Sequence, residues 1–464
     1  MGDTTSSRMC AVVCILAFVF LFISTSAMAE RKPTVCDGEK GRAYGLCRNF
    51  CEALDCDWDG HASKRACEIL RSHYRSLTGK SQFPCETMSL GCVTGDSGED
   101  PPFPFEVGDG NDYGSRVLEL TVPDQCKCDG KDCTPCPIVV GFHGYGQTGS
   151  GPNSWKSRLE PKGAAVGFIS LYPTGDITPN SYDTEGTWGT NWAVPSCQDP
   201  KDGCLDGKNC DWCGDWSENN TVSTRREIDF TRAIIKWTMD HHCVDPKQIF
   251  ATGYSNGGLW THELARHPAT ARLFKALVPV DGVDQAGINN TLKWIDAPPD
   301  GYSPWILHVN EIFDNFEPYD GRPYTDWADY GVPVWIYPPV LQIFAEYAAE
   351  NDGYSACGFG PDDVGDRFGV LEVGGVVPAG YRRLTALEGE GQGKFHCFTK
   401  DAKRQTCKKL AICLWDSGDP GDDLPDPHSR AGQEWTGGTD SGTGGLDPMD
   451  IMWRFMKASV GVPY

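Results

Sequence analysis

The stretch that decides the fold is QIFATGYSNGGLWTHELAR, residues 248–266. Its first part, Gln248–Gly253, is β-prone, and its last part, Leu259–Arg266, is helix-forming. Between them lies Gly253-Tyr254-Ser255-Asn256-Gly257, a G-x-S-x-G pattern. A serine on a tight strand-to-helix turn exposes its hydroxyl, and flanking glycines prevent clashes in that strained turn. The pattern predicts Ser255 as a nucleophile. The alternative is a glycine-rich turn that holds a serine by chance.

Working outward from this stretch, apolar runs alternate with helical patterns from about residue 114 to the end. This alternation predicts an α/β fold, a mostly parallel central sheet flanked by helices. The expected strands are Ser115–Val122, Pro137–Phe142, Ala165–Tyr172, Phe274–Val280, Trp305–Val309 and Leu410–Trp415, and the other expected helices are Glu227–His241 and Pro448–Ser459.

An activated serine needs an oxyanion hole, which is built from two backbone N–H groups aimed at the developing charge. One is expected from Asn256, which follows the nucleophile. The other is expected from the loop after the strand at Pro137–Phe142, where the sequence is His143-Gly144-Tyr145-Gly146. Tyr145 is the predicted donor. The side chain of His143 is expected to shape the loop rather than to react.

The acid and the base should follow the serine along the chain, in that order. Asp314, just past the strand at Trp305–Val309, is the predicted acid, with Asp320 and Asp281 as competitors. His396 and His428 are the only histidines after Asp314. His428 is predicted to be the general base because it follows the last strand, in a loop that can fold back toward Ser255.

Several phrases together resemble the secreted poly(3-hydroxybutyrate) depolymerase and feruloyl or acetylxylan esterase group of α/β-hydrolases. They are Phe142–Gln147, Val244–Lys247, Ala251–Gly258 and Leu307–Gly321. The resemblance covers roughly residues 114–345 and 405–460. It implies a carboxylic ester hydrolase with no metal or organic cofactor. Its substrate would be a polyester or a hydroxycinnamoyl or acetyl polysaccharide ester.

The chain departs from that group at two places. Asn310-Glu311 stands where the family usually has His-Gly before the acid. The family's compact C-terminal histidine motif is stretched here, from Gly418 through His428-Ser429 to Trp435–Gly438. A catalytically inactive binding or adhesion protein on a hydrolase fold is therefore the alternative function.

The N-terminus predicts export and a modular chain. Arg8, an apolar run from Met9 to Ile23 and the end Ala27-Met28-Ala29 are typical of a signal peptide over residues 1–29, with a retained signal anchor as the alternative. Residues 36–92 are cysteine-rich and predict a disulfide-stapled helical module. A linker follows at 93–113, and the catalytic domain is expected over 114–464, with insertions near 180–225 and 350–395.

The cysteine content indicates the compartment of the protein, and the net charge limits the classes of partner that it can bind. Removal of Cys10 and Cys14 with the signal leaves 20 of the 22 cysteines, an even number that fits a disulfide framework in a secreted, extracellular protein. The sequons at Asn219 and Asn289 fit the same route. A net charge of −23 argues against nucleic acid or anionic lipid as a partner. No later segment predicts stable membrane insertion, and the oligomeric state stays open.

Three features allow more than one interpretation. Asp55–Gly60 matches the first half of a calcium loop, but Ala66 stands at the position of the bidentate glutamate, so a polar turn is favoured. Clusters such as Cys126, Cys128, Cys133 and Cys136 could suggest zinc, although disulfides are expected in an oxidising compartment. Trp188 and Trp192, in the first insertion, are predicted either to bind substrate or to pack a small core of their own.

Overall fold

The structure is a computed structural model of the 464-residue chain. It describes residues 116–127, 134–151, 154–179, 188–192, 222–283, 302–312, 314, 317, 323–324, 335–336, 339–350, 352–360, 380–388, 395–402, 405–407, 409–415 and 448–462. Several predictions fall outside these residues: the signal peptide, the 36–92 module with its Asp55–Gly60 loop, the linker, both sequons, Asp320 and His428. All described residues belong to one structural unit.

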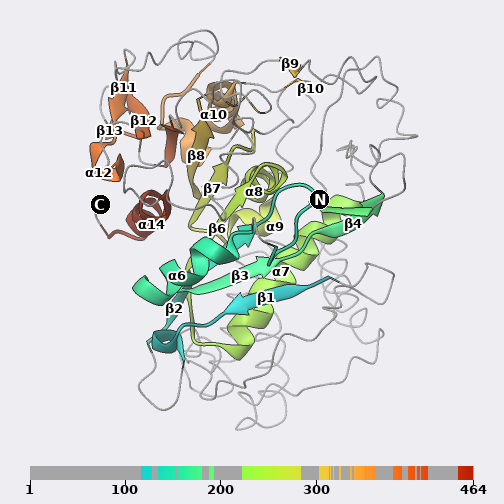
Figure 1. Ribbon diagram of the computed structural model, residues 1–464. Helices are drawn as coiled ribbons and strands as arrows, with labels where there is room; N and C mark the ends of the chain where they lie inside the picture. Colours follow the sequence, from blue (N-terminus) through green and yellow to red (C-terminus); the bar gives the residue numbers. More distant parts are fainter. Residues whose placement is uncertain are drawn as a thin grey trace, which may run out of the picture. The chain divides into compact units, whose positions relative to one another are not determined.

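The described elements follow one another along the chain from β1 to α14 (Figure 1). The strands are β1 Leu118–Thr121, β2 Cys136–Phe142, β3 Ile169–Pro173, β4 Asp176–Pro179, β5 Trp188–Asn191, β6 Val244–Tyr254, β7 Ala276–Val280, β8 Trp305–Glu311, β9 Pro323–Tyr324, β10 Trp335–Ile336, β11 Tyr381–Arg383, β12 Phe395–Ala402, β13 Gln405–Thr406 and β14 Leu410–Trp415. The helices are η2 Asp124–Cys126, α6 Lys156–Val166, α7 Val222–His241, α8 Asn256–Arg266, α9 Pro268–Ala271, α10 Val340–Glu350, α11 Asp352–Ser355, α12 Thr385–Glu388 and α14 Pro448–Ser459.

The main sheet is mixed but mostly parallel. Its order is β1-β3-β2-β6-β7-β8-β14-β12-β11, with β13 attached to β12. The six inner strands of this order run parallel to one another, namely β3, β2, β6, β7, β8 and β14. The outer strands β1, β12 and β11 are antiparallel to their neighbours. Parallel neighbours need crossover connections, which α6, α7 and α8 supply. The expected α/β architecture, a mostly parallel central sheet flanked by helices, is therefore present in the described part of the chain.

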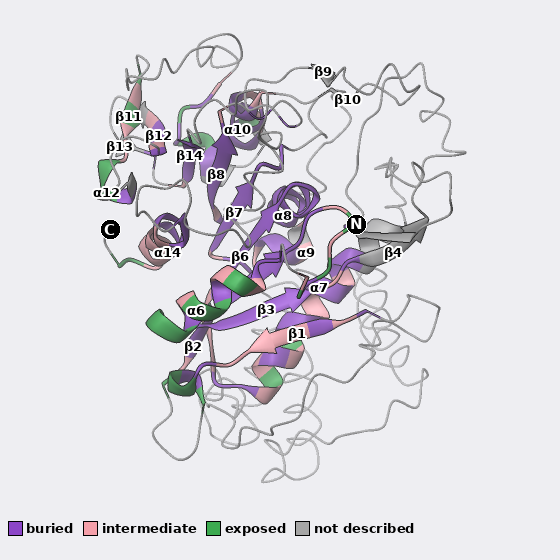
Figure 2. Cartoon of the chain, in the orientation of Figure 1, coloured by how far each residue is buried: buried purple, intermediate pink, exposed green. Residues whose placement is uncertain are grey.

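Helices cover both faces of this sheet, so its central strands are buried on both sides (Figure 2). The strands β2, β7 and β14 are buried at every position. Such strands have continuous apolar sequences rather than alternating ones. Ile138 and Val140 join an apolar cluster with residues of α7, α8 and α10, whereas Val139 joins the opposite cluster with residues of α6 and α14.

Strand β3 begins later in the structure than the sequence predicts. The interval Ala165–Tyr172 was expected to be a strand throughout, but α6 extends to Val166 and β3 begins at Ile169. Gly167 adopts φ 82°, and its N–H donates to the carbonyl oxygen of Gly163, which ends the helix. The apolar residues before Gly167 are therefore the end of a helix that the alternating pattern did not reveal.

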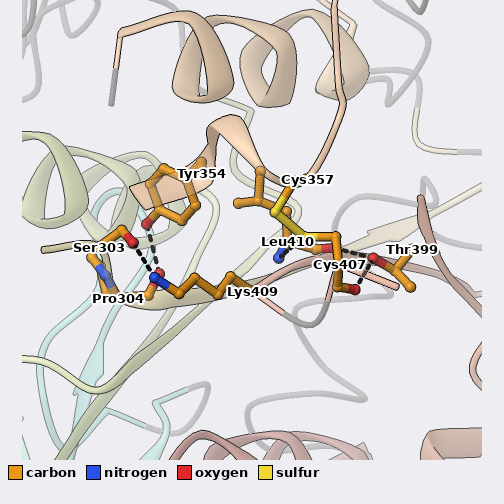
Figure 3. Close-up of a disulfide and its surroundings, with 8 residues drawn as sticks. All are labelled: Ser303, Pro304, Tyr354, Cys357, Thr399, Cys407, Lys409 and Leu410. Atoms are coloured by element: carbon orange, nitrogen blue, oxygen red, sulfur yellow. Dashed lines mark hydrogen bonds between the residues drawn. A yellow bond between two sulfur atoms is a disulfide. The ribbon is translucent and has the colours of Figure 1, made fainter. Parts of the chain in front are cut away.

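Disulfides and polar contacts hold the part of the sheet around β8, β12 and β14 together, and Figure 3 shows the Cys357–Cys407 disulfide with the polar contacts beside it. Cys397–Cys413 joins β12 to β14 at directly paired positions, and Cys357–Cys407 joins the segment after α11 to the segment before β14. Nearby, the Tyr354 hydroxyl donates to the carbonyl oxygen of Pro304 at 2.6 Å. The Lys409 ammonium donates to Ser303 Oγ at 2.7 Å. These contacts lie at the amino ends of β8 and β14, away from the ends that carry the candidate site.

Cys126 and Cys136 form a further disulfide between η2 and β2. The pairing confirms the disulfide interpretation for these two cysteines, which are therefore not free to bind zinc. Disulfides of this kind persist mainly in exported proteins, because cytosolic thiols are kept reduced. None of the helices in the described part of the chain combines the length and the apolar character needed to cross a membrane.

The strand order reverses between β2 and β6. After β2 the chain moves outward to β3, whereas after β6 it moves the other way to β7 and β8. In open α/β sheets, ligands bind at the carboxyl ends of the strands beside such a reversal. The carboxyl ends of β2 and β6 are Phe142 and Tyr254, so His143 and Ser255 are the first residues beyond the sheet at this point.

Candidate active site

Ser255 occupies a strained turn between β6 and α8. Its backbone has φ 52° and ψ −122°, a conformation that residues other than glycine rarely adopt. Its N–H donates to the carbonyl oxygen of Val280 at 2.9 Å, and its carbonyl accepts the Leu259 N–H at 2.9 Å. Strain of this kind costs about 1–3 kcal/mol and persists where the surrounding structure imposes it, often at functional sites. This is the geometry expected of a nucleophile elbow.

The glycines of the motif are required by close packing. A Cβ on Gly253 would lie 2.0 Å from the carbonyl oxygen of Gly257 and 2.6 Å from Thr261 Oγ1. A Cβ on Gly257 would lie 2.3 Å from the carbonyl oxygen of Phe142. The elbow can therefore close only if both positions lack a side chain, and the first turn of α8 packs directly on the end of β2.

The loop after β2 is pinned at several points. The Gln147 N–H donates to the carbonyl oxygen of Gly144 at 3.3 Å, and the Gly144 N–H donates to the Gln147 side chain at 3.0 Å. Gly146, with φ 68°, supplies the left-handed residue that the turn needs. Tyr145 is half-buried within this turn. Since Phe142 pairs with Gly253, the turn lies beside the Ser255 elbow.

His143 shapes this loop through both ring nitrogens. Nδ1 lies 2.7 Å from the carbonyl oxygen of Gly144, and Nε2 accepts the Gly175 N–H at 2.9 Å. Nδ1 must therefore carry the proton and donate it to that carbonyl. Burial lowers the pKa of His143 to about 4, so the ring is neutral at physiological pH.

Asn256 and Trp192 hold each other through two hydrogen bonds. The Trp192 N–H donates to Asn256 Oδ1 at 2.7 Å, and Asn256 Nδ2 donates to the Trp192 carbonyl at 3.1 Å. The Trp192 indole N–H also donates to the carbonyl oxygen of His143 at 2.9 Å. The Trp192 side chain is only 1% exposed and stacks beside Trp260. Its described contacts are thus internal, and they join the elbow to the loop after β2. For Trp188, in β5, only the backbone is described.

Four carboxylates are buried where β7 and β8 end: Asp281, Glu311, Asp314 and Glu317, each at most 1% exposed. Asp281 has φ 41°, and its Oδ1 accepts the Glu311 N–H at 2.6 Å. Asp314 Oδ1 accepts the Glu317 N–H at 2.9 Å, and Glu317 Oε2 accepts the Val283 N–H at 2.9 Å. These bonds brace the loops after β7 and β8 against each other, so the Asp314 carboxylate is held in a fixed orientation.

His396, the rival for the general base, lies on β12 and is half-buried. Its Nδ1 faces Arg383 Nη2 on β11 at 3.2 Å. In the sheet order, β12 is four strands away from β6. With strands about 4.8 Å apart, this separation is about 19 Å, too far for proton transfer from Ser255. The loop that contains His428 leaves β14, which is one strand closer to β6.

Other features of the site were missed in the sequence. The left-handed backbone of Asp281 was signalled only by the Asp281-Gly282 pair at a strand end, which is a turn signal. Burial of Glu311 and Glu317 had no sequence signal, because glutamates in loops are usually exposed. Among the described residues, no group of three or more histidines, cysteines or acidic side chains is arranged to hold a metal ion.

No protein-family model and no curated protein sequence matches this chain. Among solved structures, it is distantly similar to α/β-hydrolase esterases. An acetyl xylan esterase from Aspergillus awamori matches at 15% identity and a TM-score of 0.37, with 75% of this chain and 98% of the esterase covered. Est1E from Butyrivibrio proteoclasticus, with ferulic acid bound, matches at 14% identity and 0.26, covering 44% and 78%. An S-formylglutathione hydrolase from Staphylococcus aureus matches at 14% identity and 0.26, covering 42% and 73%.

Proposed function

We propose that the protein is a secreted serine carboxylic ester hydrolase with Ser255 as nucleophile, Asp314 as acid and His428 as general base. The observation that carries the proposal is the strained Ser255 turn at the point where the strand order reverses. At the end of β8 lies the buried and hydrogen-bonded segment that contains Asp314, called the acid segment below. Nucleophile and acid then lie at the same edge of one sheet, in the chain order that this chemistry uses.

The reaction proceeds through two acyl transfers. His428 takes the proton of Ser255 Oγ as the oxygen attacks the ester carbonyl carbon. The tetrahedral intermediate collapses, and His428 returns the proton to the departing alcohol. Water, activated by the same histidine, then attacks the acyl-enzyme and releases the carboxylic acid. Asp314 holds the imidazole in its orientation and stabilises the imidazolium.

The oxyanion is stabilised by the backbone N–H groups of Asn256 and Tyr145. Asn256 is the first residue of α8, and the first N–H groups of a helix have no acceptor within it. The partial positive charge at the start of this eleven-residue helix also favours an anion there. The Asn256 side chain contributes indirectly, since it binds the Trp192 backbone and so fixes the start of the helix.

The proposed substrates are polyesters or hydroxycinnamoyl or acetyl esters of polysaccharides. We assign the aromatic contact to the first insertion, through Trp188. Trp192 is buried and instead positions the loop after β2 through its indole bond to His143. The proposed catalytic domain spans residues 114–464, with the 36–92 module as a separate part that contributes no catalytic group.

A serine-directed fluorophosphonate probe separates this enzyme from a non-catalytic protein on the same fold. The purified chain should be labelled once, at Ser255, and labelling should stop its hydrolysis of short p-nitrophenyl esters. Mass spectrometry of the digested adduct locates the label. A folded wild-type chain that is neither labelled nor hydrolytic would instead support the binding or adhesion function.

The two buried aspartates can be distinguished by isosteric variants. Asp314→Asn should lower kcat by about four orders of magnitude, the effect known for loss of a triad carboxylate. Asp281→Asn should lower kcat by less than about tenfold, because an amide oxygen can still accept the Glu311 N–H that Asp281 Oδ1 accepts now. Steady-state kinetics on one soluble ester compares them. The reverse order would assign the acid to Asp281.

A further inference from the structure

A continuous chain of buried side-chain hydrogen bonds runs below the acid segment. The Tyr347 hydroxyl of α10 lies 2.8 Å from Nδ1 of His262 on α8. His262 Nε2 lies 3.1 Å from Nδ1 of His308 on β8, and His308 Nε2 lies 3.0 Å from Asn310 Oδ1. All four side chains are at most 1% exposed. Residues from three separate elements thus form one polar path inside an apolar cluster.

The hydrogen bonds that Asn310 donates, at one end of this path, fix the direction of every other hydrogen bond in it. Asn310 Nδ2 donates to the carbonyl oxygens of Glu311 and Glu317, at 3.0 and 3.2 Å. The amide oxygen of Asn310 therefore faces His308 and accepts from Nε2–H. His308 Nδ1 must then accept from His262 Nε2–H, and His262 Nδ1 must accept from the Tyr347 hydroxyl. This arrangement satisfies each donor with one proton on each ring.

Both histidines are held neutral. Burial lowers the pKa of His308 to about 4, against a raising effect of its bond to Asn310. Burial, His308 and Arg266 lower the pKa of His262 well below its usual range. Arg266 lies over the Tyr347 ring and pairs with Glu346 at 3.5 Å. A second proton on His308 would lie on Nδ1 and turn two donors toward each other at the 3.1 Å contact with His262 Nε2.

Asn310, at the end of the path, is hydrogen-bonded to both ends of the segment that contains Asp314. Glu311 and Glu317 border this segment, and Asn310 binds the carbonyls of both. Within it, the Asp314 N–H donates to the Glu311 carbonyl at 3.2 Å, and the Glu317 N–H donates to Asp314 Oδ1. A shift of Asn310 would therefore move both ends of the loop and turn the Asp314 carboxylate.

We propose that the path Tyr347–His262–His308–Asn310 is a positioning relay that sets the place of the Asp314 carboxylate from the face of the sheet that α8 and α10 cover, and this rests on the proposed function. The four residues touch no substrate. They act through Asp314, which orients the general base. A buried polar network is costly unless every member is satisfied, and when satisfied it fixes one arrangement of the elements that it joins.

Two amides at position 308 test the relay. In His308→Gln, the amide nitrogen overlies Nε2 and can still donate to Asn310, but the link to His262 is lost. In His308→Asn, the amide oxygen overlies Nδ1 and can still accept from His262, but Asn310 is released. The relay predicts that the Asn variant loses about tenfold or more in kcat with KM nearly unchanged, and that the Gln variant loses only about threefold.

The acid limb of the kcat/KM profile provides a second readout. A displaced carboxylate stabilises imidazolium less, so the limb should move to lower pH in His308→Asn and should move less, in the same direction, in His308→Gln. Tyr347→Phe, which keeps the ring packing, is the far-end variant. It should show a smaller loss of kcat, about threefold, with a shift in the same direction. Thermal melts confirm that each variant is folded.

The outcomes separate the relay from the proposed function. Suppose that the wild-type enzyme is active and that folded His308→Gln, His308→Asn and Tyr347→Phe all keep its kcat and its acid limb. The relay alone is then overturned, and these residues serve only to pack the core. Equal losses in the two amide variants, without a shift of the limb, overturn it as well. A wild-type chain without hydrolysis or labelling overturns the proposed function and the relay together.

Discussion

Ser255→Ala is expected to abolish ester hydrolysis, with a loss of about six orders of magnitude in kcat, the scale of nucleophile removal in serine hydrolases. No other group in the proposed site can form the acyl-enzyme. The fold should survive, because the bonds that the structure gives Ser255 to Val280 and Leu259 come from its backbone, which alanine keeps. Kinetics on a short p-nitrophenyl ester, with a thermal melt of the same sample, checks both statements.

A glycine at the same position gives a matched control. Relief of the positive φ is worth about 1–3 kcal/mol, whereas the added chain entropy of glycine costs about 0.5–1 kcal/mol. Ser255→Gly should therefore be as inactive as the alanine variant, yet melt at the same or a higher temperature than wild type. An Ala variant with near-wild-type turnover would remove Ser255 from the reaction. A Gly variant that melts well below wild type would show that the turn is not strained.

The central strands and the elbow could be predicted because local sequence and buried position agree there. Leu410–Trp415 and Pro448–Ser459 form β14 and α14 with the predicted bounds. Gly253 is required by contacts with Gly257 and Thr261, which lie only a few positions along the chain. In such places, propensity, apolar pattern and turn chemistry all favour the same structure.

The remainder of the site depends on contacts between distant residues. His262 and His308 are 46 positions apart and meet only in the folded chain, where α8 packs on β6 and β7 and β8 lies next to β7. Asn256 binds the backbone of Trp192, 64 positions earlier. A lone histidine or asparagine in the sequence gives no sign of such a partner. Strand β3 also begins later than predicted, at Ile169, because Gly167 ends α6.

His428→Ala should lower kcat by about six orders of magnitude, as expected for removal of a general base that acts as a unit with its nucleophile. The histidine must reach Ser255 from the end of β14, three strands away, or about 14 Å at normal strand spacing. His428 lies thirteen positions after Trp415, and an extended chain of that length spans about 43 Å. The stretched loop is therefore long enough to return to the elbow.

Loop length is also a minor energetic obstacle, since each doubling costs only about 0.6 kcal/mol. The matched control is His396→Ala. His396 faces Arg383 on β11 and lies about 19 Å from the elbow by strand spacing, so its loss should change kcat by less than about tenfold. Both variants are to be compared on one soluble ester, with fluorophosphonate labelling rates as a second measure. If activity disappeared in His396→Ala and persisted in His428→Ala, the base would have to be His396, and the position of β12 relative to β6 would have to differ.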